Sequence, residues 1–75
     1  MSKRRQVKGK EAVRAFERAG FCVVRIKGSH HVMKRDGHPG RLSIPVHGNE
    51  DIGNGLLLSQ IALAGLTVDQ FYDLL

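Results

Sequence analysis

The feature that most restricts the fold of this chain is a two-residue connection, Gly28-Ser29, between two runs with strand character. The run before it, residues 21–26, is rich in β-branched residues, and the run after it, residues 30–35, has the length of a strand. Glycine suits the first central position of a type II′ turn, which joins antiparallel strands tightly. The sequence therefore predicts a β-hairpin at this place.

The rest of the chain places this hairpin inside one small α+β domain of 75 residues. The predicted elements are a basic, flexible arm over residues 1–7, an amphipathic helix from Lys8 that Gly20 ends, the hairpin, a third strand over 41–47, a second helix from Leu56 to Gly65, and a short last helix that opens on the capping box Thr67–Gln70. Pro45 favours an edge position for the third strand, because proline cannot donate to a strand ladder. In the second helix, Leu58 and Leu63 are expected to broaden the buried apolar stripe. The predicted order is α-β-β-β-α, with residues 8–75 forming a single domain.

Charge is segregated along the chain. All twelve Lys and Arg residues lie within residues 1–41, whereas residues 42–75 contain four acidic residues and no Lys or Arg. A basic half is typical of proteins that bind polyanions such as nucleic acid, although charge can also serve solubility alone. The single cysteine, Cys22, permits no internal disulfide and is expected to be a small buried residue. A single cysteine suits a reducing cytoplasm, and no apolar run approaches the ~20 residues of a membrane span, so a soluble, intracellular protein is expected.

The register of the hairpin decides which side chains share a face. A two-residue turn pairs Lys27 with His30, whereas a three-residue turn would pair Ile26 with His30 and place this histidine on the apolar face. We prefer the first register because it separates charge from apolar bulk. It places Cys22, Val24, Ile26, His31 and Met33 toward the helices. The opposite, open face then carries Arg25, Lys27, His30, Lys34, Arg41 and His47, and Lys10 on the first helix adds a further phosphate-binding candidate.

The four histidines do not form a recognisable metal site. There is no cysteine pair and no histidine pair at helical i, i+4 spacing, and His30 and His31 point to opposite faces of a strand. Phosphate-binding glycine loops, nucleotide fingerprints and nucleophile elbows are also absent from the sequence. Ribonuclease chemistry remains open, because RNA supplies its own 2′-hydroxyl nucleophile and needs only an acid, a base and cations. A non-catalytic RNA-binding module fits the same residues equally well.

Several short motifs occur in order along the chain and resemble those of one family. They are Gly20-Phe21 leading to Arg25, the run Lys27-Gly28-Ser29-His30-His31, the run Ile44–His47, and Ala64-Gly65-Leu66-Thr67. Together they resemble the HicA (YcfA-like) toxins, the mRNA interferases of HicAB toxin–antitoxin pairs. The similarity covers nearly the whole chain from Lys8 to Leu75.

The resemblance implies a fold like that of double-stranded-RNA-binding domains, metal-independent cleavage of mRNA without a cofactor, and a HicB-type antitoxin as partner. The catalytic histidine of the family follows Gly-Ser, which corresponds to His30. Gly28 and Ser29 would shape the turn, and the Ser29 hydroxyl would orient the imidazole or the phosphate. His47 is a candidate second acid or base, or simply an exposed residue at a strand end. A protein whose basic face only docks an acidic antitoxin is a further alternative.

Overall fold

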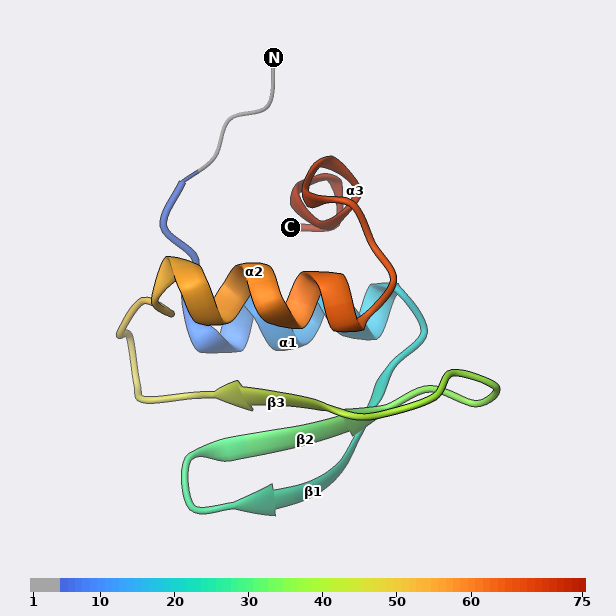
Figure 1. Cartoon of the computed structure of the whole chain (residues 1–75). Coiled ribbons are helices and arrows are strands. Elements are labelled where there is room, and N and C mark those ends of the chain that lie inside the picture. Colours follow the sequence, from blue (N-terminus) through green and yellow to red (C-terminus); the bar gives the residue numbers. More distant parts are fainter. Residues whose placement is uncertain (1–4) are drawn as a thin grey trace.

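A computed structural model describes residues 5–75 and shows the predicted order of elements. The elements are α1 (Gly9–Arg18), β1 (Cys22–Lys27), β2 (His30–Lys34), β3 (Leu42–Pro45), α2 (Asn54–Leu63) and α3 (Val68–Asp73). The three strands form one antiparallel sheet in the order β1-β2-β3 (Figure 1). The predicted α-β-β-β-α fold with a short terminal helix is confirmed. None of the helices described is long and apolar enough to cross a membrane.

The hairpin has the two-residue turn that the sequence predicts. Lys27 lies opposite His30, and Ile26 lies opposite His31. Gly28 has a φ of 59°, in the left-handed region that a type II′ turn requires at its first central position. His31 in turn lies opposite Ile44, whose side chain is fully buried. The preferred register is therefore confirmed: His30 lies on one face of the sheet and His31 on the other.

A β-bulge in β1 alters the faces predicted for its first half. The pairing shifts between Val23 and Arg25, so that Val23 lies opposite the buried Met33, and Cys22 lies opposite the exposed Lys34. One extra residue in a strand reverses the alternation of every side chain beyond it. The prediction of a buried Cys22 on the helix side is consequently wrong, since Cys22 is exposed.

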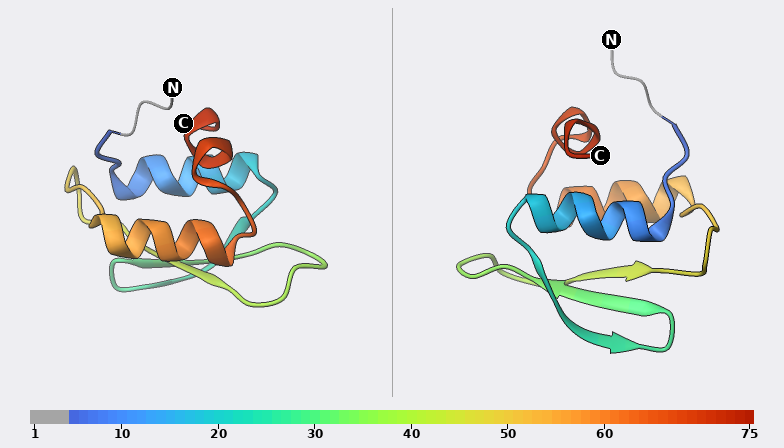
Figure 2. Two further views of the ribbon diagram at one scale, coloured as in Figure 1. Left: turned by 45° about the horizontal axis from the view of Figure 1, so that its top comes forward. Right: turned by 180° about the vertical axis from the view of Figure 1, so that it is seen from behind.

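All three helices lie on the same side of the sheet, which leaves the other side open (Figure 1). Figure 2 shows α1 and α2 above the sheet, with α3 on their far side. The core between these layers is built from apolar side chains of every element, and its centre is aromatic. The ring centroid of Phe16 lies 5.0 Å from that of Phe71 and 6.1 Å from that of Phe21. Strand β1 is covered least, and Val24 and Ile26, predicted to face the helices, are 54% and 60% exposed.

Helix α2 buries a narrower stripe than its sequence suggests. Leu57, Ile61 and Ala64, which recur at spacings of four and three residues, are buried against the core. Leu58 and Leu63, predicted to broaden this stripe, are exposed. A polar side chain completes the contact with the sheet: the side-chain oxygen of the buried Gln60 accepts a hydrogen bond of 2.9 Å from the backbone N–H of Ser43. This bond satisfies a backbone N–H of β3. The strand lies at an edge of the sheet, as its Pro45 predicts.

A histidine outside the open face fixes the loop between β2 and β3. Arg35 donates a hydrogen bond to Nδ1 of His38, so the proton of this imidazole lies on Nε2, which donates to the carbonyl of Leu63 at 2.7 Å. Arg35 also donates to the carbonyl of Ala19 and lies over the ring of Phe21. His38 is therefore held by a structural network that joins the loop to the end of α2.

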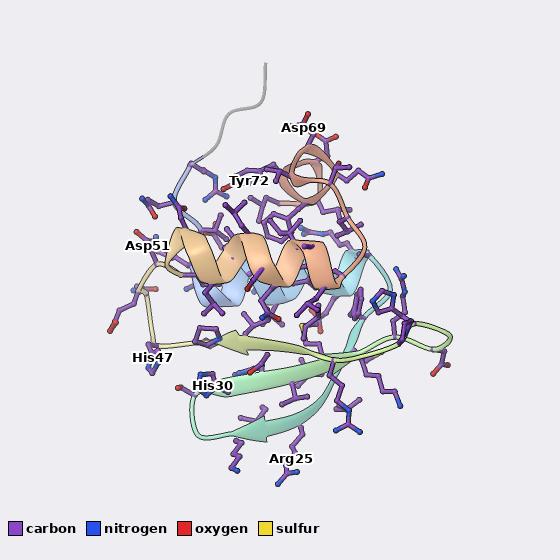
Figure 3. The ribbon with its side chains drawn as sticks, in the orientation of Figure 1. Arg25, His30, His47, Asp51, Asp69 and Tyr72 are labelled. Atoms are coloured by element: carbon purple, nitrogen blue, oxygen red, sulfur yellow. The ribbon has the colours of Figure 1, made fainter. Side chains whose placement is uncertain are left out.

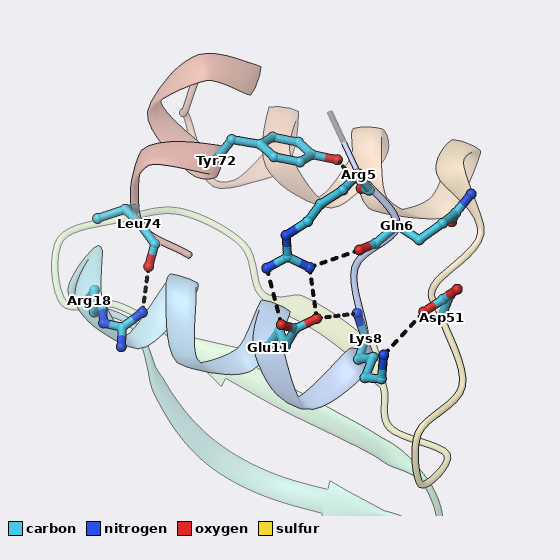
Figure 4. A network of polar contacts seen from close by, with 8 residues as sticks. All are labelled: Arg5, Gln6, Lys8, Glu11, Arg18, Asp51, Tyr72 and Leu74. Atoms are coloured by element: carbon cyan, nitrogen blue, oxygen red, sulfur yellow. Dashed lines mark hydrogen bonds and ion pairs between the residues drawn. The ribbon is translucent and has the colours of Figure 1, made fainter. Parts of the chain in front are cut away.

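The predicted basic arm is only partly described, because residues 1–4 lie outside the described residues. The remainder differs from a flexible arm. Val7 is buried in the core, and its carbonyl accepts a hydrogen bond from the N–H of Ile52. Arg5 makes two hydrogen bonds to the carboxylate of Glu11, and its carbonyl accepts a bond from the hydroxyl of Tyr72 (Figure 4). The packed domain thus includes residues 5–7.

The ion pair at the start of α1 gives a pH-dependent contribution to stability. Hydrogen bonds from Arg5 and from the backbone N–H of Lys8 lower the pKa of Glu11 from 4.5 to about 2. A lowered carboxyl pKa stabilises the folded state above pH 4.5, and this stabilisation is lost as the pH falls toward 2.

We therefore expect Glu11→Gln to lower the melting temperature at pH 6 by about 2–4 °C, because a solvent-exposed ion pair contributes little to stability. The difference from the wild type should disappear as the pH approaches 2. Thermal unfolding followed by circular dichroism over this range measures both curves. Parallel curves for the two proteins would show that the Arg5–Glu11 pair is not responsible.

Candidate functional site

The candidate site lies at the end of the sheet where β1 turns into β2 and where β3 ends. His30 is the first residue of β2, and its pairing with both Lys27 and Pro45 places it on the open face. Its side chain is exposed. Figure 3 shows His30 and His47 at this same end of the sheet, with no helix over His30 on the open side. A hairpin with a two-residue turn thus presents one imidazole to the solvent.

A second imidazole is tied to the turn of the hairpin. Oγ of Ser29 and Nε2 of His47 lie 3.1 Å apart in a hydrogen bond. The backbone strengthens the same connection, because the N–H of Val46 donates to the carbonyl of Ser29 at 2.7 Å. The serine next to His30 therefore contacts the imidazole of His47. The sequence suggested an orienting role for Ser29, but the 18-residue separation gave no means of choosing His47 as its partner.

Exposed cations lie along the open face, from the end that carries His30 to the opposite end of the sheet. Arg25 and Lys27 belong to β1, Lys34 ends β2, and Arg41 precedes β3. Within residues 5–75, none of these four side chains makes an ion pair or a side-chain hydrogen bond, and the three strands contain no acidic residue. Their charge is therefore available to an anionic ligand. Figure 3 shows Arg25 projecting from the outer strand, away from the helices.

Lys10 lies in the other layer of the molecule, on the first turn of α1. Its Nζ donates a hydrogen bond of 3.1 Å to the side-chain oxygen of Asn49. The start of α1 packs closely on the end of β3, because a Cβ at Gly9 would come within 2.2 Å of the carbonyl oxygen of Pro45. Lys10 is thus near the end of the sheet that carries His47, but it is not part of the open face.

The histidines are not arranged as a metal site in the part of the chain that the structure describes. No three His, Cys, Asp or Glu side chains of residues 5–75 come together closely enough to hold an ion. A pocket of about 370 Å³ lies in the helical layers. It is lined by Arg5, Gln6, Asn54, Leu57, Leu58, Val68 and Tyr72. The groups available for chemistry at the candidate site are two imidazoles, the Ser29 hydroxyl and the cations of the open face.

The structure has an antiparallel sheet with helices on one face and with a histidine and unpaired cations on the other. These features define a class of small α+β domains suited to bind polyanions. Comparison with protein families makes this more specific. The family model for "HicA toxin of bacterial toxin-antitoxin" matches residues 9–66 of the 75-residue chain. The chain belongs to the HicA toxin family. A search among curated proteins found no match.

The matched region contains the whole open face, both candidate histidines and helix α2. Membership in a family of toxins from toxin–antitoxin systems implies an antitoxin as partner. The resemblance seen in the sequence is therefore confirmed at the level of the family.

Proposed function

We propose that this protein is an mRNA endoribonuclease, the toxin of its pair, and that His30 is its catalytic acid/base. The observation that supports this most strongly is the register of the hairpin, which puts His30 on an uncovered basic face while its neighbour His31 faces the core. A catalytic imidazole has to reach the substrate, and an exposed position on a rigid turn allows this. Membership in the HicA toxin family agrees with the proposal.

In the proposed mechanism, the RNA supplies the nucleophile. His30 as general base takes the proton of a ribose 2′-hydroxyl, and the oxygen attacks the adjacent phosphorus. The bond to the 5′-oxygen of the next nucleotide breaks, and an acid protonates this leaving oxygen. The products are a 2′,3′-cyclic phosphate and a 5′-hydroxyl. No metal ion is required, because the cations of the open face stabilise the charge on the phosphorane.

The four cations of the open face fall into two groups, one next to His30 and one further along the sheet. Lys27 lies directly opposite His30, so it is placed to stabilise charge on the reacting phosphate. Arg25 lies two residues further along β1, opposite Val32, and Lys34 and Arg41 lie toward the far end of the sheet. These three would hold the neighbouring phosphates of the strand. Lys10 would contact RNA only where the strand passes the end of the sheet beside Asn49.

His47 is the proposed second acid/base. Its hydrogen bond to Ser29 holds the imidazole next to the residue that precedes His30, so two proton-transfer groups would face one phosphate. Gly28 and Ser29 thus position both histidines. The turn they form places His30, and the hydroxyl of Ser29 orients His47.

This assignment predicts a bell-shaped dependence of the cleavage rate on pH, with one limb from each histidine. His47→Ala should remove one limb and slow cleavage by about 10²-fold or more. Ser29→Ala should keep both limbs and slow cleavage less, while Ser29→Thr, which retains the hydroxyl, should restore the rate. Initial rates measured from pH 5 to pH 9 on a labelled RNA separate these outcomes. A complete bell in His47→Ala would exclude His47 as the second group.

The proposed activity is tested by incubating the purified protein with end-labelled RNA, with and without EDTA, and by analysing the product ends. We expect cleavage that EDTA does not reduce, and products that carry 2′,3′-cyclic phosphate. Binding of the RNA without cleavage would instead favour the alternative function, a non-catalytic RNA-binding module. Cleavage that stops in EDTA would contradict the metal-independent mechanism.

The biological partners follow from the same proposal. The substrate would be cytoplasmic mRNA, and a HicB-type antitoxin would neutralise the toxin by covering the open face. An antitoxin that binds there has to present acidic groups to the four cations, because the face carries no acid of its own in the strands described. Replacing Lys34 and Arg41 with alanine should therefore weaken the binding of both RNA and the antitoxin, which fluorescence anisotropy measures.

A further inference from the structure

The segment that builds the sheet has an unusual composition for a surface that binds RNA. Between Cys22 and His47 the chain contains no Phe, Tyr, Trp, Asn, Gln or Glu. Proteins that recognise single-stranded RNA by sequence stack its bases on aromatic rings and bond the base edges with side chains, commonly amides. Besides its cations and histidines, the open face carries serine hydroxyls and the exposed thiol of Cys22 as polar side-chain groups. A hydroxyl pairs with donors and acceptors of any base, and a thiol is only a weak donor and acceptor.

The aromatic residues of the whole chain are accounted for elsewhere. The sequence has three phenylalanines, one tyrosine and no tryptophan. Phe16, Phe21 and Phe71 are at most 2% exposed in the core. Tyr72 lies in α3, beyond the helices, where its hydroxyl donates to the carbonyl of Arg5. No aromatic ring other than the histidines is therefore left to stack on a base at the open face.

We infer that this toxin holds RNA through the phosphate backbone, with little preference among bases. The inference rests on the proposed function and specifies its substrate class: any accessible RNA strand, selected by its charge and not by its sequence. The four unpaired cations, Arg25, Lys27, Lys34 and Arg41, provide about four phosphate contacts. Arg25 and Arg41 are also able to stack on bases through the guanidinium plane, but such stacking tolerates every base.

Counterion release gives this inference a numerical form. For single strands the logarithm of the binding constant falls by about 0.7 per phosphate contact for each tenfold rise in salt. Four contacts predict a slope of about −3, which corresponds to roughly a 50-fold loss of affinity between about 50 and 200 mM salt. Replacing one cation should reduce the slope by about 0.7 and should do so equally for every base composition.

The test uses His30→Ala, so that RNA is bound but not cut, and measures its affinity by fluorescence anisotropy over a series of salt concentrations. The probes are labelled strands of adenosine only, cytidine only and uridine only, and a mixed strand that contains guanosine. We expect affinities within about fivefold of one another and slopes near −3. A strand that binds tenfold or more tighter than the others, or a slope near zero, would overturn the inference.

Matched substitutions show which face is responsible. In the His30→Ala background, Lys34→Ala should reduce the slope for all four strands, whereas Arg14→Ala should leave it unchanged, because Arg14 is an exposed cation on α1 in the helical layer. A reduced slope in Arg14→Ala alone would place the RNA on the helical side and contradict the inference. Absence of binding to every strand would instead contradict the proposed function itself.

Discussion

Replacing His30 with alanine is expected to slow RNA cleavage by about 10²- to 10⁴-fold, the usual contribution of a general acid or base. The fold should be unaffected, because the side chain of His30 is exposed and makes no hydrogen bond within residues 5–75. The melting temperature and the far-ultraviolet circular dichroism of the variant should therefore match those of the wild type. Single-turnover rates on a labelled RNA measure the loss.

The neighbouring histidine provides the matched control. His31 faces the core, opposite Ile26 and Ile44, and its buried Nδ1 has no hydrogen-bond partner among residues 5–75. His31→Ala should lower stability through lost packing, while the folded protein retains its cleavage rate within about threefold, well short of a general-base loss. A loss of rate in His31→Ala as large as that in His30→Ala, with the fold intact, would contradict the division of roles between the two residues.

The largest expected effect on stability is that of Phe16→Ala. Phe16 is fully buried between the rings of Phe21 and Phe71, so its removal leaves a cavity at the point where α1, β1 and α3 meet. Phe→Ala substitutions in cores cost about 3–5 kcal/mol. A chain of this length has about 4–11 kcal/mol of stability in total. We therefore expect a fall in melting temperature of more than about 12 °C, or a protein that does not fold at 25 °C.

Leu63→Ala serves as the control for this prediction. Leu63 is also a large apolar residue, but it is 55% exposed on α2. Its replacement should change the free energy of unfolding by less than about 0.5 kcal/mol. Chemical denaturation of both variants measures the two values. Similar losses in both would mean that the core is not centred on Phe16 as the structure indicates.

The sequence predicts the hairpin and the face of His30 because local chemistry decides them. A glycine in a two-residue turn fixes the register, and the register fixes every side chain from Arg25 to Lys34. The capping box at Thr67 is equally local: Thr67 accepts a hydrogen bond from the N–H of Gln70, as its motif predicts. The order of elements follows from periodicity, which also indicates the inward face of α2 but overestimates its width, since Leu58 and Leu63 are exposed.

Other features depend on contacts between distant parts of the chain, so they escape prediction. The bulge at Val24 exposes Cys22, and the sequence of β1 contains no residue that predicts a bulge. The Ser29–His47 bond joins residues 18 apart, and the His38 network joins a loop to the end of α2. Only the packed structure shows that Val7 belongs to the core, since the adjacent basic residues suggest a free arm.

In the proposed mechanism, His30 activates a 2′-hydroxyl of RNA. The most direct test incubates the wild type and His30→Ala with a short DNA strand that contains a single ribonucleotide, and it maps the products. We expect the wild type to cut once, after the ribose, leaving a 2′,3′-cyclic phosphate, and His30→Ala to leave the strand intact. Cleavage at deoxyribose positions would show that the 2′-hydroxyl is not the nucleophile, and equal cleavage by His30→Ala would show that His30 does not activate it.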